Sequence, residues 1–235
     1  MRNVGITFDD EKHTYRDFGM ICTSLEVGLP ELKTKKVELK GADGYIDLTE
    51  VFGRTMYGNR TIKAQFVIKE TSASDWANNV SKISNYLHGR KRKIVLDMDK
   101  GFFYEGRIQE KHEKEYRPYS TVTLTMDCYP FKREVEDSSQ YCWKWDSFSL
   151  VDGIIREYNS IDVDGDYTMV IIGREQVIVP TIYSDAAMTV DFEGNTYELI
   201  SGKNYIYQMT IKEGRNELVF HGTGTISVQY RGGKL

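Results

Sequence analysis

Cysteine and proline are both scarce in this chain. Its 235 residues include three cysteines and four prolines. Cys22, Cys128 and Cys142 are odd in number, far apart and without CxxC spacing, which argues against a disulfide framework or a zinc site. We expect reduced thiols in a protein made in a cytosol. The 16 tyrosines and 10 phenylalanines, with few prolines, favour strands joined by turns.

Long apolar runs and an excess of positive charge are also missing. No stretch approaches the roughly 20 apolar residues of a membrane-spanning helix. The first residues, Met1–Gly5, lead directly into a strand-like segment, so a signal peptide is not expected. The net charge is −4, the opposite sign to that of a protein that grips phosphates. Neither membrane binding nor sequence-specific nucleic-acid binding is therefore expected.

Catalytic and metal-binding motifs are absent. The sequence contains no GxSxG, P-loop, GxGxxG or HExxH pattern. Asp162–Asp166 resembles the start of a calcium loop, but Gly165 is fourth rather than sixth, and Gly173 stands where the bidentate Glu is needed. We expect an acidic hairpin turn there, with no metal and no cofactor. A hydrolase that uses paired carboxylates stays open as an alternative, since Asp and Glu are numerous.

Alternating segments dominate the first half of the chain. Thr61–Lys69 alternates polar with apolar residues, as a strand with one buried face does. Thr121–Cys128 has the same pattern, and its apolar residues are expected to face inwards. Lys35–Lys40 also alternates and predicts a further half-buried strand.

One segment has helical periodicity. Trp76, Val80, Ile83 and Leu87 follow at spacings of four, three and four, which gives one apolar stripe. Ser72 or Ser74 can cap the start of this helix, and Gly89 ends it. A lone helix among strands is expected to lie across a sheet. The basic run at residues 90–93 is interpreted as the charged end of this helix rather than as a nucleic-acid patch.

The pattern changes after Phe131. Lys132–Ser139 is polar and without periodicity, which predicts a boundary between domains at residues 1–133 and 134–235. Turn signals then recur about every 8–12 residues, as in a β-sandwich. Trp143 and Trp145 point the same way if they lie in a strand. They are candidates for stacking on sugar rings, although buried packing is the more frequent use of Trp. A carbohydrate-binding module or adhesin is therefore an alternative function.

A set of short motifs occurs in a recognisable order over most of residues 5–130. The set consists of Ile6–Asp9 with His13, Tyr15, Asp17, Phe18 and Gly19; Pro30; Gly41–Thr49; Tyr57–Arg60; the Trp76 helix ending at Leu87–Gly89; Leu96–Asp99; and Phe103–Arg107. This ordered set resembles the distal tail (Dit) proteins of long-tailed phages. Ala42 stands where that family usually has Arg, so a salt bridge from this side chain is not expected. The run from Thr189 to Leu218 is similar to the galectin-like sandwich that many members append.

The resemblance implies both a fold and a role. The fold would be mainly β, with an N-terminal β-sandwich or barrel-like domain that carries one α-helix and a C-terminal galectin-like β-sandwich. The N-terminal domain would build a hexameric ring at the virion tail tip, and the C-terminal domain would project outwards. The ring would join the tail tube protein to a tail-associated lysin or hub protein and to receptor-binding proteins, and leave a channel for DNA. No family residue is catalytic, so an enzyme is not expected.

The residues themselves also favour assembly. Exposed strand edges and loops suit pairing between chains, and a closed ring satisfies repeated head-to-tail contacts without forming filaments. Two nearby glycines permit close backbone approach, and three acidic residues can meet a basic partner. The predicted assembly interface is Gly41, Asp43, Gly44, Tyr45, Asp47 and Glu50. A solvated hairpin loop is the alternative interpretation of this segment.

Overall fold

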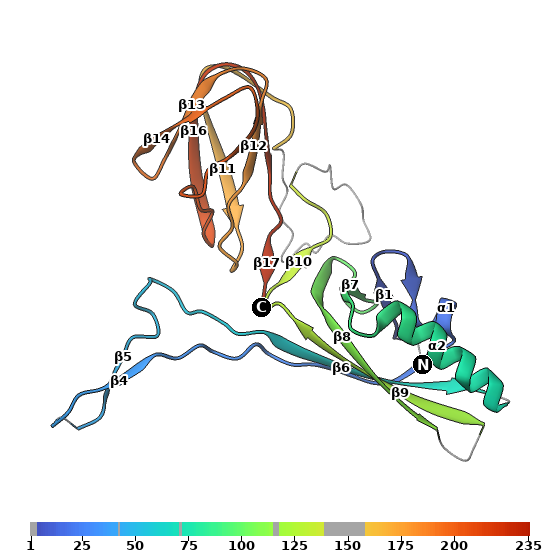
Figure 1. Ribbon diagram of the computed structural model, residues 1–235. Coiled ribbons are helices and arrows are strands. Elements are labelled where there is room, and N and C mark those ends of the chain that lie inside the picture. The colour runs from blue at the N-terminus through green and yellow to red at the C-terminus, as the bar shows by residue number, and fades with distance from the viewer. Residues whose placement is uncertain (1–3, 42, 71, 115–117, 139–157) are drawn as a thin grey trace. The chain divides into compact units, whose positions relative to one another are not determined.

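A computed structural model describes residues 4–41, 43–70, 72–114, 118–138 and 158–235 (Figure 1). The fold is mainly β, as the sequence predicts. The chain forms two compact units, called here the first unit (Met1–Asp99 with Phe103–Lys132) and the second unit (Lys100–Phe102 with Arg133–Leu235). Each has its own apolar core.

The elements have the following bounds. The helices are α1 (Thr14–Phe18) and α2 (Ala73–Leu87). The strands of the first unit are β1 (Ile6–Phe8), β2 (Lys12–His13), β3 (Ile21–Val27), β4 (Lys36–Glu38), β5 (Tyr45–Asp47), β6 (Arg60–Lys69), β7 (Lys91–Leu96), β8 (Phe102–Lys114) and β9 (Tyr119–Cys128). The strands that follow are β10 (Lys132–Glu134), β11 (Ile161–Gly173), β12 (Thr181–Ser184), β13 (Met188–Phe192), β14 (Asn195–Leu199), β15 (Gly202–Tyr205), β16 (Gly214–Gln229) and β17 (Gly233–Lys234).

The first unit is built on one antiparallel sheet in the order β2-β1-β7-β8-β9-β6-β3. The predicted alternation is confirmed in its central strands. In β6 the side chains of Ile62, Ala64, Phe66 and Ile68 are buried, and in β9 those of Val122, Leu124, Met126 and Cys128 are fully buried. These two strands pair over ten residues, so their apolar faces combine into one core.

Helix α2 lies against this core, as its stripe predicts (Figure 1). The Ser72 side chain caps its start by accepting from the Asp75 N–H at 3.1 Å, and Gly89 takes a positive φ of 69° just beyond its end. Ile83 and Leu87 are buried, whereas Trp76 and Val80 are half-buried. The stripe is therefore deepest in the C-terminal half of the helix.

Polar groups also lie beneath α2, under both halves of the helix. The buried Glu70 carboxylate receives hydrogen bonds from Asn79 of the helix at 3.4 Å and from Lys114 at 3.2 Å. The Ser84 hydroxyl donates to the buried Glu110 carboxylate. Ser120 Oγ is buried and has no hydrogen-bond partner within the described part of the chain.

The short helix α1 was not expected from the sequence, which predicts only strands and turns there. His13 forms it by capping. Its Nδ1 accepts from the N–H groups of Tyr15 and Arg16 at 3.1 and 3.3 Å, and its Nε2 lies 3.0 Å from the Asp97 carboxylate. Gly19 then ends the helix with a φ of 66°. These motif residues therefore have a structural role at the start of the chain.

The second unit contains a sheet in the order β14-β13-β16-β12-β15, with β11 paired to β16. Strand β11 pairs with β16 over all 13 of its residues, from Ile161 to Gly173. The expected acidic hairpin turn at Asp162–Asp166 is therefore wrong, because these residues lie within β11. Their carboxylates bond across the pair to Thr225, Thr223 and His221 of β16. The three Asp residues alternate with Val163 and Gly165, which places them on one exposed face.

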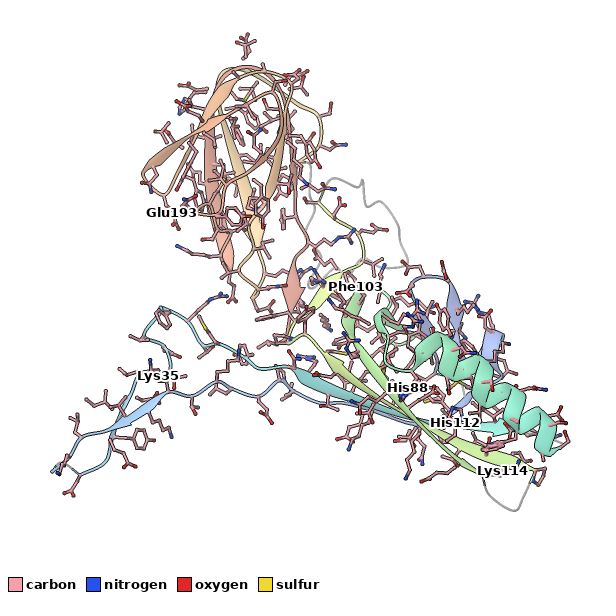
Figure 2. The ribbon with its side chains drawn as sticks, viewed as in Figure 1. Lys35, His88, Phe103, His112, Lys114 and Glu193 are labelled. Carbon is pink, nitrogen blue, oxygen red and sulfur yellow. The ribbon has the colours of Figure 1, made fainter. Side chains whose placement is uncertain are left out.

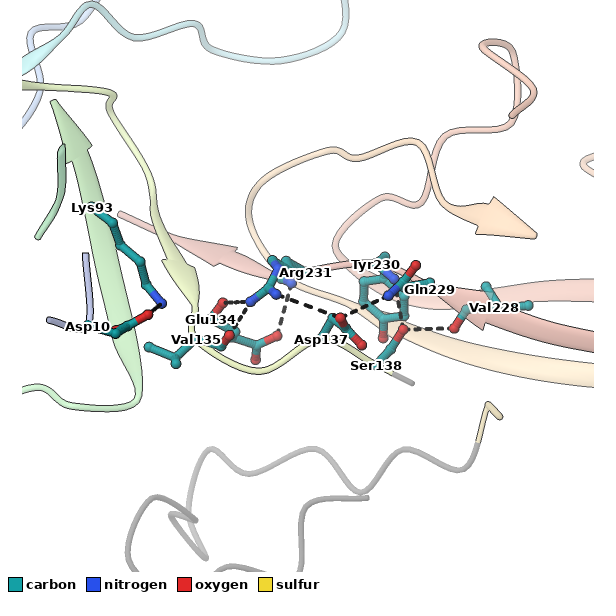
Figure 3. A network of polar contacts seen from close by, with 11 residues as sticks. Asp10, Lys93, Glu134, Val135, Asp137, Ser138, Val228, Gln229, Tyr230 and Arg231 are labelled. Carbon is teal, nitrogen blue, oxygen red and sulfur yellow. Dashed lines mark hydrogen bonds and ion pairs between the residues drawn. The ribbon is translucent and has the colours of Figure 1, made fainter. Parts of the chain in front are cut away.

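Residues 134–138 are tied to the end of β16 and to the residues that follow it (Figure 3). Arg231 donates to the backbone carbonyls of Glu134 and Val135, and Ser138 Oγ donates to the Val228 carbonyl at 2.8 Å while accepting from the Tyr230 N–H at 2.8 Å. The Glu134 carboxylate accepts from Arg174 at 2.6 Å. This segment therefore belongs physically to the second unit although it precedes residues 139–157, which lie outside the described residues.

Candidate assembly surface

A long hairpin leaves the sheet of the first unit between β3 and β6. We call residues 28–59 the arm; β4 and β5 lie at its far end (Figure 1). None of the described residues of the arm is buried. Figure 2 shows its side chains, including that of Lys35, projecting to both sides of a bare hairpin. No described residue of the arm belongs to the core of the first unit.

Backbone hydrogen bonds run along the arm from its root to its tip. The Gly28 N–H donates to the Thr61 carbonyl at 3.0 Å, Lys33 donates to Met56 at 2.9 Å, and Leu48 donates to Lys35 at 2.7 Å. A Cβ on Gly28 would lie 2.7 Å from the Thr61 carbonyl oxygen, so only glycine fits this close crossing at the root. The ladder explains how an extended segment keeps its shape without a core.

Side chains near the root hold the arm to the sheet. The Tyr57 ring packs edge-on against Phe131, with centroids 5.9 Å apart. Arg60 is 3% exposed and its guanidinium lies 5.4 Å from the centre of the Tyr104 ring. A buried cation over an aromatic face is a favourable pair. The Tyr57–Arg60 motif is therefore the anchor at which the arm joins the body of the unit.

The predicted interface residues lie at the tip of the arm and just beyond it. Gly41 and Gly44 have φ values of 88° and 80°, the conformation that glycine adopts at little cost. Asp43 lies between them, Tyr45 and Asp47 belong to β5, and Glu50 follows in a turn that the Gly53 N–H closes at 2.8 Å. The structure thus brings these six residues together on one hairpin end. Their part in assembly stays a prediction.

The hairpin end has two different faces. Val37 of β4 is paired directly with Ile46 of β5, and Leu39 shares their face by alternation. Lys36 pairs with Asp47 on the other face, and Glu38 pairs with Tyr45. Both faces are exposed. The expectation that Lys35–Lys40 forms a half-buried strand is therefore wrong, because no described part of the chain covers the apolar face.

Local hydrogen bonds set the charges of the polar face. Lys36 Nζ donates to the Tyr45 hydroxyl at 3.0 Å, and this bond raises the pKa of Lys36. Hydrogen bonds from the Thr49 hydroxyl and from its N–H, 2.9 Å from Asp47 Oδ1, hold the pKa of Asp47 below its usual value. Both groups stay charged at neutral pH, so this face is suited to a polar partner.

Exposed apolar side chains occur along the whole arm and not only at its tip. Nine of the twenty exposed large apolar residues in the described chain belong to it: Leu29, Leu32, Val37, Leu39, Tyr45, Ile46, Val51, Phe52 and Met56. Leu29 and Phe52 are the most exposed, at 82% and 75%. Sequence reasoning missed both. The signal available was an apolar pair, Val51-Phe52, inside a glycine-rich segment with no periodicity.

The remaining candidate residues form no second site within the described ranges. Trp143 and Trp145 lie outside the described residues. In the described ranges, no group of three or more His, Cys, Asp and Glu side chains could hold a metal ion. The basic run is neutralised locally, since Arg92 pairs with Asp9 and Lys93 with Asp10, each at 2.6 Å. Among the helices that the structure describes, none is long and apolar enough to cross a membrane.

Comparison with known proteins finds a likeness of fold without a likeness of sequence. No protein-family profile matches the chain, and no curated protein matches it. Among solved structures, the chain is similar to the Dit protein of phage SPP1, described as a paradigm of the hub adsorption apparatus in phages that infect Gram-positive bacteria. The TM-score is 0.66, the two chains are 13% identical, and the match covers 99% of each. The chain thus shares the fold of a phage Dit protein over its whole length.

Proposed function

We propose that this chain is a structural protein of a phage or prophage tail tip. Copies of it form a hexameric ring that joins the tail tube to the host-adsorption apparatus and leaves a channel for DNA. Residues 1–133 build the ring, and residues 134–235 form a domain that projects outwards. The partners are the tail tube protein, a tail-associated lysin or hub protein and receptor-binding proteins, and no catalysis is assigned.

The observation that carries the proposal is the arm. An isolated two-stranded hairpin is marginal in water, and exposed apolar patches on a soluble protein usually mark an interaction surface. Nine exposed apolar side chains on one hairpin need a cover that the described chain does not supply. Similarity of fold to a phage hub protein supports a neighbouring copy as that cover.

The arm also suits a ring for a geometric reason. An arm that docks on a different surface of the next copy makes a head-to-tail contact, and such contacts close into a ring or continue as a filament. Its apolar face, which includes Val37 and Ile46, would bury against the neighbour, while Lys36 and Asp47 on the opposite face would stay in contact with water or with a polar rim. The predicted interface residues Gly41 to Glu50 would lie at the far end of this contact.

Native mass measurement tests this proposal. The full chain, alone and with its neighbouring tail components, is expected to give a particle of six times 27.2 kDa, seen as a ring in negative stain. The double variant Leu29→Asp, Phe52→Asp should lose the particle and remain folded, because neither residue belongs to the core. Met98→Asp is the matched control, since Met98 is 64% exposed in the same unit but lies outside the arm.

Two results would count against the proposal. The first is a protein that stays monomeric at high concentration even with the other tail components present. The second is a ring that survives the double arm variant and is lost in the Met98 control. The latter would move the subunit contact from the arm to another surface of the first unit.

A further inference from the structure

Three exposed tyrosines gather at one edge of the second unit. Tyr183 belongs to β12, Tyr205 to the edge strand β15, and Tyr207 follows directly after it. They are 40%, 47% and 76% exposed. Ile206 between the last two packs against the core. Alternation within β15 turns Tyr205 outwards. Tyr207 lies in the turn after the strand, and its ring contacts that of Tyr205.

The pairing register places Tyr183 and Tyr205 on the same face of the sheet. Tyr205 is opposite Thr181, and Thr181 is opposite Gln229 of β16. In the adjacent row, Lys203 is opposite Tyr183, and Tyr183 is opposite Ser227. We call these six residues with Tyr207 the tyrosine face. Tyr205 and Tyr207 meet edge to face, with centroids 5.0 Å apart and ring planes at 84°.

The rings are presented in a fixed arrangement with polar groups beside them. The edge-to-face contact orients Tyr207 against Tyr205. On the far row, Ser227 Oγ accepts from the Ser160 N–H and donates to Asn159, each at 2.9 Å. Within the described residues, no hydrogen bond engages the three tyrosine hydroxyls or the Lys203 ammonium. Donors and acceptors are thus available around aromatic surfaces that are held in place.

We infer that the tyrosine face binds a short stretch of a saccharide chain. The apolar C–H face of a sugar ring can lie on a tyrosine ring, and its hydroxyls can bond to the phenol groups, Thr181 and Lys203. Ligand sites typically combine apolar and aromatic surface with a few placed polar groups. A single ammonium in the patch fits a neutral or weakly anionic saccharide.

Patch size argues against a protein partner as the main occupant. A stable protein interface buries roughly 800 Å² per partner and takes about 20–30 residues on each side. The tyrosine face has seven residues, and neither an arginine nor an aliphatic side chain is among them. This inference is independent of the arm and of the ring.

A glycan array tests it with the labelled full chain as probe. The array carries neutral and anionic bacterial oligosaccharides, and isothermal titration follows with the saccharide that gives the strongest signal. Tyr205→Ala and Tyr207→Ala should each weaken binding roughly tenfold or more. Tyr205→Phe, which removes only a hydroxyl, should weaken it less. Tyr119→Ala, at a 44% exposed tyrosine of the first unit, should leave binding unchanged.

Each outcome supports or overturns saccharide binding at the tyrosine face. Loss of binding in the two alanine variants, with unchanged melting temperatures, supports the tyrosine face. A blank array with the unaltered chain overturns the inference. So does binding that both alanine variants retain, including the case in which Trp143→Ala abolishes it, because the sugar would then bind elsewhere. A blank array together with loss of binding to a purified tail component in Tyr207→Ala would reassign the face to a protein.

Discussion

The body of the first unit and its arm both contain alternating strands, but the apolar side chains are buried in the body and exposed in the arm. In β6 of the body, Ile62 and Phe66 are buried on one face beneath helix α2, whereas Val37 and Ile46 in the arm are exposed on theirs. Both segments alternate and both pair antiparallel. The difference is the second layer, which the described residues supply over β6 and not over the arm. Alternation therefore indicates that a face is to be covered, and says nothing about which chain covers it.

The largest expected effect contrasts two phenylalanines. Phe66→Ala removes a fully buried side chain and should lower the free energy of unfolding of the first unit by about 3–5 kcal/mol. Phe52→Ala removes a 75% exposed one and should change it by less than about 0.5 kcal/mol. Urea unfolding followed by hydrogen exchange of the β6 amides measures both. Equal losses would show that the arm packs on the body in solution.

Two glycines give the next contrast. A Cβ on Gly106 of β8 would lie 2.4 Å from the Asp127 carbonyl oxygen and 2.6 Å from Cys128 Sγ, so Gly106→Ala should cost about 1–3 kcal/mol of global stability by overpacking. Gly44 in the arm has open space but a φ of 80°. Gly44→Ala should therefore cost about 1–2 kcal/mol of local hairpin stability and leave the global unfolding midpoint of the first unit unchanged. A fall in that midpoint for Gly44→Ala would contradict the separation.

A smaller effect of opposite sign is expected at Ser120. Its hydroxyl is buried and unpartnered within the described part of the chain, so Ser120→Ala should raise the unfolding free energy by about 1 kcal/mol. Thr123→Ala on the same strand is the control, because Thr123 is only half-buried on the opposite face. The difference in melting temperature is the measurement. Destabilisation by Ser120→Ala would reveal a bound water that satisfies the hydroxyl.

The smallest effect concerns pH and the arm. The Thr49 bonds depress the pKa of Asp47 below its ordinary 3.8, so their contribution to the hairpin is complete above that value and is lost as the pH falls through the folded pKa. Exchange protection of the Thr49 N–H should thus be constant from pH 5 to 8, apart from the intrinsic rate, and fall only in strong acid. Asp47→Asn should remove the acid dependence, and a transition near neutral pH would contradict the assignment.

The body of the first unit could be predicted well from local pattern. The periodicity of β6, β9 and α2 reports burial by the chain itself. The observed faces agree residue by residue in the two strands, and in α2 Ile83 and Leu87 are buried while Trp76 and Val80 are half-buried. The second half was harder. Asp162–Asp166 has turn-like composition but lies in a strand, because β16 provides a partner for each exposed side chain. His13 caps a helix, and Gly106 allows two strands to approach closely. Local sequence pattern shows neither role.

By itself, the sequence determined the mainly β class, the main strands of the first unit and the capped helix, because these depend on side-chain periods and local hydrogen bonds. It also determined the positive φ values of Gly41 and Gly44, since a tight hairpin end demands them. Only the tertiary structure decided that residues 28–59 stand away from the core, and that Tyr183, Tyr205 and Tyr207 share one face. Both depend on contacts between residues far apart in the chain, and local pattern carries no record of those distances.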